Sequence, residues 1–188
     1  MSKTKYPRAD ALAVAKELCD HLKPYCQRLI VAGSLRRRKA EVGDVEILYV
    51  PTMATEPDGL FGGREYSLAD HHIDAAFACG IIAQRKNVRG STTWGPKNKL
   101  AMHIASGIPV DFFATTAEAW YNYLVCRTGP AESNIAICQA SIAKGWRWNP
   151  YAAGFSRQQG VETEIYLVTS ERDVFDFVGL PFRDPWER

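Results

Sequence analysis

Three acidic residues stand at positions where carboxylates could bind divalent metal ions. Two of them, Asp44 and Glu46, flank Val45 at the start of the apolar run 45–50. Side chains alternate between the faces of a strand, so both carboxylates should point the same way while Val45 faces the core. Two acids on one face repel each other unless water, cations or basic groups compensate them, which makes the pair a candidate metal site. A solvent-facing strand edge is the alternative, because so short a motif is not specific.

The third acid, Asp111, lies alone inside the apolar segment 108–113. An unpaired carboxylate in such a strand is costly, so Asp111 is expected to meet a cation. If its strand lies beside the first, three carboxylates can hold two divalent ions, one acting on an attacking hydroxyl and one on a triphosphate. The pattern therefore predicts phosphoryl-transfer chemistry.

A small basic turn precedes the paired acids. Gly33 and Ser34 end an apolar run and are followed by Arg36 and Arg37. Backbone amides and a hydroxyl in such a turn can hold phosphate oxygens, and arginine can meet the charge of a triphosphate. Glycine–serine pairs are common, so the weight rests on the order: strand, turn, basic pair, Gly43 with two acids, and a distant single acid.

Composition limits the class of protein without naming a partner. The 188 residues carry 23 Lys and Arg against 21 Asp and Glu, a net charge of +2, so any nucleic-acid signal must come from local clusters. The 5 cysteines are scattered without a CxxC pair, which argues against disulfides and zinc. No apolar run approaches the roughly 20 residues of a membrane span. We expect a reduced, non-secreted protein of the cytoplasm, the nucleoid or a viral replication site.

One basic cluster includes an aromatic residue. Trp94, Lys97 and Lys99 fall in and beside a loop between two predicted strands. Such a loop suits stacking on a template base and contact with phosphate, although a plain hairpin tip fits the same residues. These three residues are the candidate DNA contacts.

Apolar periodicity supplies the elements that must position these residues. Spacings of three and four predict helices, and short apolar runs bounded by Gly or Pro predict strands. Pro57 and three glycines predict a loop over 52–67. The predicted helices are 8–27, 68–79, 116–125, 130–144 and 170–177, and the predicted strands are 29–32, 45–50, 81–86, 100–105, 108–114, 146–148 and 164–168.

Residues 31–37 together with 43–48 resemble the signature of the family X DNA polymerases, the family of DNA polymerase beta. Four further segments resemble family elements in the same order along the chain. They are 110–113, similar to the strand of the third carboxylate; 128–134, similar to the sugar- and base-contacting segment; 143–151, similar to a thumb turn; and 173–185, similar to the closing helix and tail.

This resemblance implies an α+β fold: a nucleotidyltransferase palm, with a mixed sheet flanked by helices, over 1–120 and a small α+β thumb over 121–188. It implies that Mg²⁺, or Mn²⁺, is bound by the catalytic residues Asp44, Glu46 and Asp111. It also implies that Ser34 and Arg37 face the triphosphate and that Asn134 lies near the incoming base. The full set of implied nucleotide-binding residues is Gly33, Ser34, Arg37, Gly43, Arg127, Thr128, Gly129 and Asn134.

Three departures from the family pattern affect this expectation. One helix alone precedes the palm, so no lyase or helix-hairpin-helix module is expected, as in the small viral family X enzyme. Glu46 stands where the family has Asp, which favours slower catalysis or a preference for manganese. Cys126 and Arg127 replace an aromatic pair beside the sugar, which puts discrimination between deoxy- and ribonucleotides in question.

The expected function is transfer of a deoxynucleoside monophosphate to a primer 3′ hydroxyl, in short-gap filling during DNA repair. The expected partners are primer-template or gapped DNA and a dNTP, with no membrane, and the protein is expected to be a monomer. The alternatives are a template-independent or non-DNA nucleotidyltransferase, since fold does not fix function, and a non-catalytic DNA-end binder.

Overall fold

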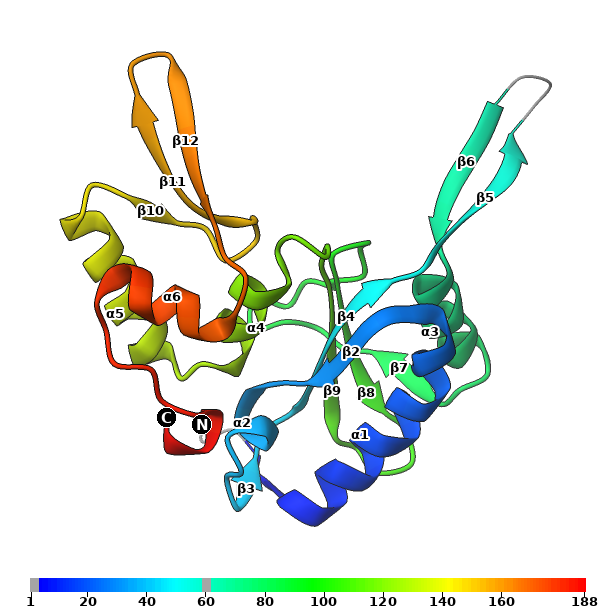
Figure 1. Ribbon diagram of the computed structural model, residues 1–188. Helices are drawn as coiled ribbons and strands as arrows, with labels where there is room; N and C mark the ends of the chain where they lie inside the picture. Colours follow the sequence, from blue (N-terminus) through cyan, green and yellow to red (C-terminus); the bar gives the residue numbers. More distant parts are fainter. Residues whose placement is uncertain (1–3, 59–61) are drawn as a thin grey trace. The chain divides into compact units, whose positions relative to one another are not determined.

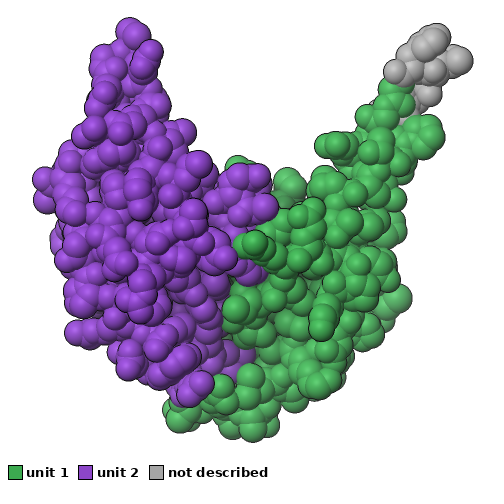
Figure 2. Space-filling model, viewed as in Figure 1, with its two compact units in different colours: residues 1–31, 40–114 green, residues 32–39, 115–188 purple. Residues whose placement is uncertain are grey.

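The computed structural model describes residues 4–58 and 62–188. The chain forms two compact units (Figure 2). The first contains the chain up to Val31 and Ala40–Ala114, and the second contains Ala32–Lys39 and Thr115–Arg188. The segment 32–39 thus groups with the second unit although it lies inside the sequence of the first, which a single division at residue 120 does not anticipate.

A mixed sheet forms the centre of the first unit (Figure 1). The neighbouring strands β4 and β9 are parallel, and the remaining neighbours are antiparallel. The strands are, in spatial order, β2 (Cys26–Val31), β4 (Val45–Pro51), β9 (Pro109–Ala114), β8 (Asn98–His103) and β7 (Ile82–Gln84). The structure confirms the predicted α+β class, with the expected strands displaced by a few residues at their ends.

Helices α1 (Arg8–Leu22) and α3 (Leu68–Ala78) contact this sheet. Tyr49 and Phe112 mark the helix-facing side, since Tyr49 binds Asp70 of α3 and Phe112 lines a cavity shared with both helices. The first helix ends five residues before the predicted residue 27. Pro24 lies in a 3₁₀ turn, Lys23–Tyr25, that stops the helix because proline cannot donate a backbone hydrogen bond.

Two antiparallel strand pairs complete the described part of the first unit. β1 (Tyr6–Pro7) pairs with β3 (Glu41–Val42), and β5 (Met53–Asp58) pairs with β6 (Gly62–Ser67). The loop prediction for 52–67 is therefore wrong over 53–58 and 62–67, and its part 59–61 lies outside the described residues. The β5–β6 ribbon extends beyond the sheet (Figure 1) and is largely exposed on both faces, so it lacks the apolar alternation that identifies a strand.

The second unit packs helices against a three-stranded antiparallel sheet. Its core contains Val125, Ile137, Trp148, Phe155 and Val174, each at most 8% exposed. Its elements are α2 (Gly33–Arg36), α4 (Trp120–Thr128), α5 (Ala131–Ala143), β10 (Arg147–Trp148), β11 (Gly154–Gln159), β12 (Glu162–Leu167), α6 (Glu171–Val178) and the 3₁₀ turn Pro185–Glu187.

Helix α6 begins as the sequence predicts. The Ser170 hydroxyl caps it by accepting a hydrogen bond from the Asp173 amide at 3.1 Å. Strand β11 was missed, because Gln158 and Gln159 give it little apolar character. No helix in the described residues is long and apolar enough to cross a bilayer.

Candidate active site

The backbone of the first unit places the predicted acids close together at the sheet. Glu46 on β4 is directly paired with Asp111 on the parallel neighbour β9. Asp44 lies immediately before β4, two residues ahead of Glu46, so the three acidic positions are neighbours at this end of the sheet. The paired acids lie on the face opposite to α1 and α3, because Tyr49 and Phe112, at odd offsets from them, face those helices. The expectation that the two acidic strands are neighbours is confirmed.

Burial differs among the acids. Asp111 is only 8% exposed, whereas Asp44 and Glu46 are half-buried. Gly43, immediately before Asp44, is buried and lies between β3 and β4. The site is therefore an acidic patch at the start of β4, with its most buried carboxylate on β9.

Asp111 also has a cationic partner that the sequence analysis missed. Its carboxylate forms an ion pair with the guanidinium of Arg85, and the two side chains are 11% and 25% exposed. Across the described ranges, no three His, Cys, Asp or Glu side chains are grouped as a metal cage. The backbone brings the three acidic positions together, but the side chains are not arranged around a common centre.

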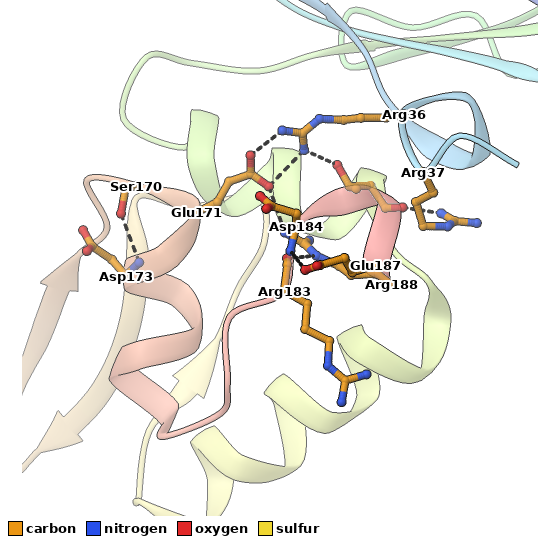
Figure 3. Close-up of polar contacts among 10 residues, drawn as sticks. Arg36, Arg37, Ser170, Glu171, Asp173, Arg183, Asp184, Glu187 and Arg188 are labelled. Carbon is orange, nitrogen blue, oxygen red and sulfur yellow. Dashed lines mark hydrogen bonds and ion pairs between the residues drawn. The ribbon is translucent and has the colours of Figure 1, made fainter.

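The predicted phosphate-binding turn lies in the second unit. Gly33 and Ser34 begin α2, and the Ser34 carbonyl accepts a hydrogen bond from the Lys39 amide at 3.1 Å. Arg37 follows the helix, and its Nη1 donates to the Thr128 carbonyl (Figure 3). Gly129 has φ +62°, and a Cβ there would lie 3.2 Å from Arg37 Nη1. Three predicted nucleotide-binding residues, Arg37, Thr128 and Gly129, are thus in one cluster.

Arg36, which precedes Arg37 in the same turn, binds the carboxylate of Glu171. Its guanidinium donates two hydrogen bonds to Glu171 at 2.9 and 2.5 Å and a third to the Thr128 hydroxyl at 2.6 Å. Arg188 reaches the same carboxylate at 3.3 Å (Figure 3). The three charged side chains are between 2% and 17% exposed. This Glu171 cluster fixes α2 against α4 and α6.

Asn134 and Arg127 occupy α5 and α4. The Asn134 Nδ2 donates to the Cys126 carbonyl at 2.9 Å, which leaves its buried Oδ1 without a hydrogen bond within the described chain. The buried Nε of Arg37 is likewise unsatisfied there. Arg127 donates to the Tyr123 hydroxyl at 3.2 Å. Buried polar atoms are normally paired, so an unsatisfied acceptor and donor at predicted nucleotide-binding residues are consistent with ligand contacts.

The predicted DNA contacts have different surroundings. Lys97 is exposed. Trp94 is half-buried, donating to Asp74 at 2.9 Å and packing 5.5 Å from the Phe77 ring. Lys99 is only 4% exposed.

The burial of Lys99 corrects its expected role. Its ammonium lies 2.9 Å from an Asp70 carboxylate oxygen and donates to the Gly95 carbonyl at 3.2 Å. Asp70 also accepts from the Tyr49 hydroxyl at 2.7 Å. The side chain points to the helix face of the sheet, where it serves the core and not a DNA phosphate.

The sequence analysis did not predict the structural roles of Arg85, Arg36 and Glu171. Arg85 stands with Lys86 and Arg89 in a basic cluster of the sequence, and the expected need of Asp111 for a cation was the available signal. The pairing of the strands decides which basic residue meets Asp111. Arg36 and Glu171 are 135 residues apart, and no local pattern connects them.

Comparison with known proteins agrees with this geometry. Residues 123–188 match the family model of the DNA polymerase beta thumb. The ternary P/T complex of Leishmania infantum polymerase beta is similar with TM-score 0.74 and 20% identity, over 98% of this chain and 77% of that one. The ternary gap complex of the same polymerase gives 0.73 and 19%, over 98% and 71%. The chain therefore has a polymerase beta-like fold, with a segment at 123–188 of the thumb type.

Proposed function

We propose that this protein is a metal-dependent DNA polymerase that adds a deoxynucleoside monophosphate to a primer 3′ hydroxyl in short gaps. The observation that carries the proposal is the pairing of Glu46 with Asp111 on parallel neighbouring strands, with Asp44 immediately before the first of them. The Leishmania infantum polymerase beta structures are ternary P/T and gap complexes, which supports DNA as the partner.

The donor set fits magnesium or manganese. Carboxylate oxygens are the ligands these ions prefer; Glu46 and Asp111 come from adjacent strands, and Asp44 immediately precedes β4. When bound, two such ions activate the attacking hydroxyl and neutralise charge on the triphosphate. The carboxylates of Asp44, Glu46 and Asp111 would together hold these ions.

The nucleotide is assigned to residues of the second unit. Arg37 would meet the triphosphate through its guanidinium, whose Nε is buried and unsatisfied. Asn134 would offer its Oδ1 acceptor to an N–H of the base. The Gly33–Ser34 turn at the start of α2 would add backbone amides and a hydroxyl.

Glu46 is expected to favour manganese. Its extra methylene moves the oxygens by about an ångström relative to Asp, and magnesium demands near-ideal octahedral geometry at about 2.1 Å. Manganese tolerates a looser arrangement, so we expect a higher rate in Mn²⁺ and a smaller preference for Mn²⁺ in Glu46→Asp.

Extension of a labelled primer on a one-nucleotide gap tests the proposal. Each dNTP and rNTP is supplied in Mg²⁺ and in Mn²⁺, and Asp111→Asn is the inactive control. Complementary extension that the control lacks is the expected result. Addition without regard to the template base would instead identify a template-independent transferase, and gap binding without incorporation in either metal would leave a DNA-end binder.

A further inference from the structure

Arg85 lies in the same transverse row of the sheet as the two paired acids. The Arg85 amide donates to the Leu100 carbonyl at 3.0 Å, and Leu100 is directly paired with Asp111. Asp111 is in turn paired with Glu46. Residues in register across a sheet point to one face, so Glu46, Asp111, Leu100 and Arg85 share the acidic face.

The Arg85 side chain crosses Leu100 to reach Asp111. Neighbouring strands are about 4.8 Å apart, so the strands of Arg85 and Asp111 are separated by roughly two such spacings. An extended arginine side chain and the Asp111 side chain together cover that distance. It forms an ion pair there with the most buried of the three carboxylates. The positive charge therefore stands where a divalent ion would have to approach Asp111.

Resting on the proposed function, we infer that Arg85 is the resident counter-ion of Asp111, and that it keeps free divalent ions away from the acidic face while no nucleotide is bound. A free ion carries two positive charges and is repelled by the guanidinium. A metal–dNTP complex has a net charge of about −2 and is attracted by it. The same arginine thus discriminates between the two forms of the metal and makes loading depend on the nucleotide.

Mn²⁺ binding to the full-length protein, followed by electron paramagnetic resonance, tests this inference without catalysis. Titrations are made with and without a non-hydrolysable dNTP. We expect Arg85→Gln to bind free Mn²⁺ about tenfold more tightly than wild type, while its binding of Mn²⁺ with nucleotide is unchanged or weaker. Arg85→Lys keeps the charge and should stay near wild type.

Lys86→Gln is the matched control. Lys86 is exposed and adjacent in sequence, and its substitution removes the same charge away from Asp111. Equal free-Mn²⁺ affinity in wild type and Arg85→Gln, including no measurable binding by either, would overturn the inference. Tighter binding in Lys86→Gln as well would overturn it too, because the effect would then be one of net charge.

Failure of the inference is distinguishable from failure of the proposed function. If wild type extends a gapped primer in a metal-dependent way while Arg85→Gln shows no gain in free-Mn²⁺ affinity, only the role of Arg85 is wrong. If neither wild type nor any variant binds Mn²⁺ with nucleotide present and none extends the primer, the polymerase proposal fails together with the inference on Arg85. Thermal unfolding of each variant confirms that the comparison is made between folded proteins.

Discussion

Lys99 illustrates how one buried cation can serve stability where its sequence context indicates DNA binding. Replacing it by methionine leaves the Asp70 carboxylate, 19% exposed, without its 2.9 Å partner. Breaking a buried ion pair from one side typically costs about 3 kcal/mol or more. We expect Lys99→Met to lower the free energy of unfolding by about 3 kcal/mol, measured by urea denaturation. Lys97→Met, at an exposed neighbour, should lower it by less than about 0.5 kcal/mol.

The cysteines should differ sharply in reactivity. Burial raises the pKa of the Cys19 thiol to about 11 and that of Cys26 to about 12, so at pH 8 their thiolates are rare. Cys79 is exposed. We expect iodoacetamide at pH 8 to alkylate Cys79 well before Cys19 or Cys26, as followed by peptide mass spectrometry. Alkylation of Cys26 at the same rate as Cys79 would contradict this difference.

At the scale of single residues, the sequence predicts which residue types the site needs, but it does not predict which side chains they pair with. Asp111 in an apolar strand predicts a cation correctly, because burial of a lone carboxylate is costly wherever the strand lies. That the cation is Arg85 depends on the register of β7, β8 and β9, which local spacing does not encode. Lys99 was misassigned for the same reason, since its side of the strand is set by pairing.

Among the elements, the Glu171 cluster connects α2 to α4 and α6. Glu171→Gln would leave the Arg36 and Arg188 guanidiniums facing each other with no carboxylate between them, at 17% and 2% exposure. We expect a loss of about 2 to 3 kcal/mol in the free energy of unfolding.

Asp176→Asn is the matched control for this substitution, since Asp176 is an exposed acid on the same helix. Its free energy of unfolding should change by less than about 0.5 kcal/mol. Equal effects of the two substitutions would show that the loss follows from the charge of α6 and not from the cluster.

The β11–β12 pairing depends on a residue without a side chain. A Cβ on Gly154 would lie 1.7 Å from the Tyr166 carbonyl oxygen, which no small adjustment relieves. We expect Gly154→Ala to displace β11 and to destabilise the protein by about 3 kcal/mol, seen as a lower urea midpoint of tryptophan fluorescence. Gly95→Ala, where no atom lies within 4 Å, should leave the midpoint unchanged.

Prediction of whole elements succeeded where one face is buried. Strand β4 and helices α3 and α6 have a core-facing stripe or run, so apolar periodicity locates them. The β5–β6 ribbon is exposed on both faces and contains Pro57, which gives the composition of a loop. Its strands are defined by pairing with each other, a property that single-sequence patterns do not report.

For the molecule as a whole, the small net charge of +2 limits long-range attraction to DNA. If the proposed DNA binding rests on a few local contacts, the logarithm of the binding constant should fall against that of salt concentration with a slope of roughly −3 to −5. We expect Lys97→Gln to reduce that slope by about 1. Lys16→Gln, an exposed lysine paired with Asp20, should not change it, and fluorescence anisotropy with gapped DNA measures both.

The grouping of Ala32–Lys39 with the second unit has a consequence for modular exchange. The polypeptide passes from one unit to the other at three points, after Val31, Lys39 and Ala114. A cassette cut at residue 115 would carry Glu171 but leave Arg36 behind in the donor protein. A chimera built from this second unit must therefore transplant residues 32–39 with it.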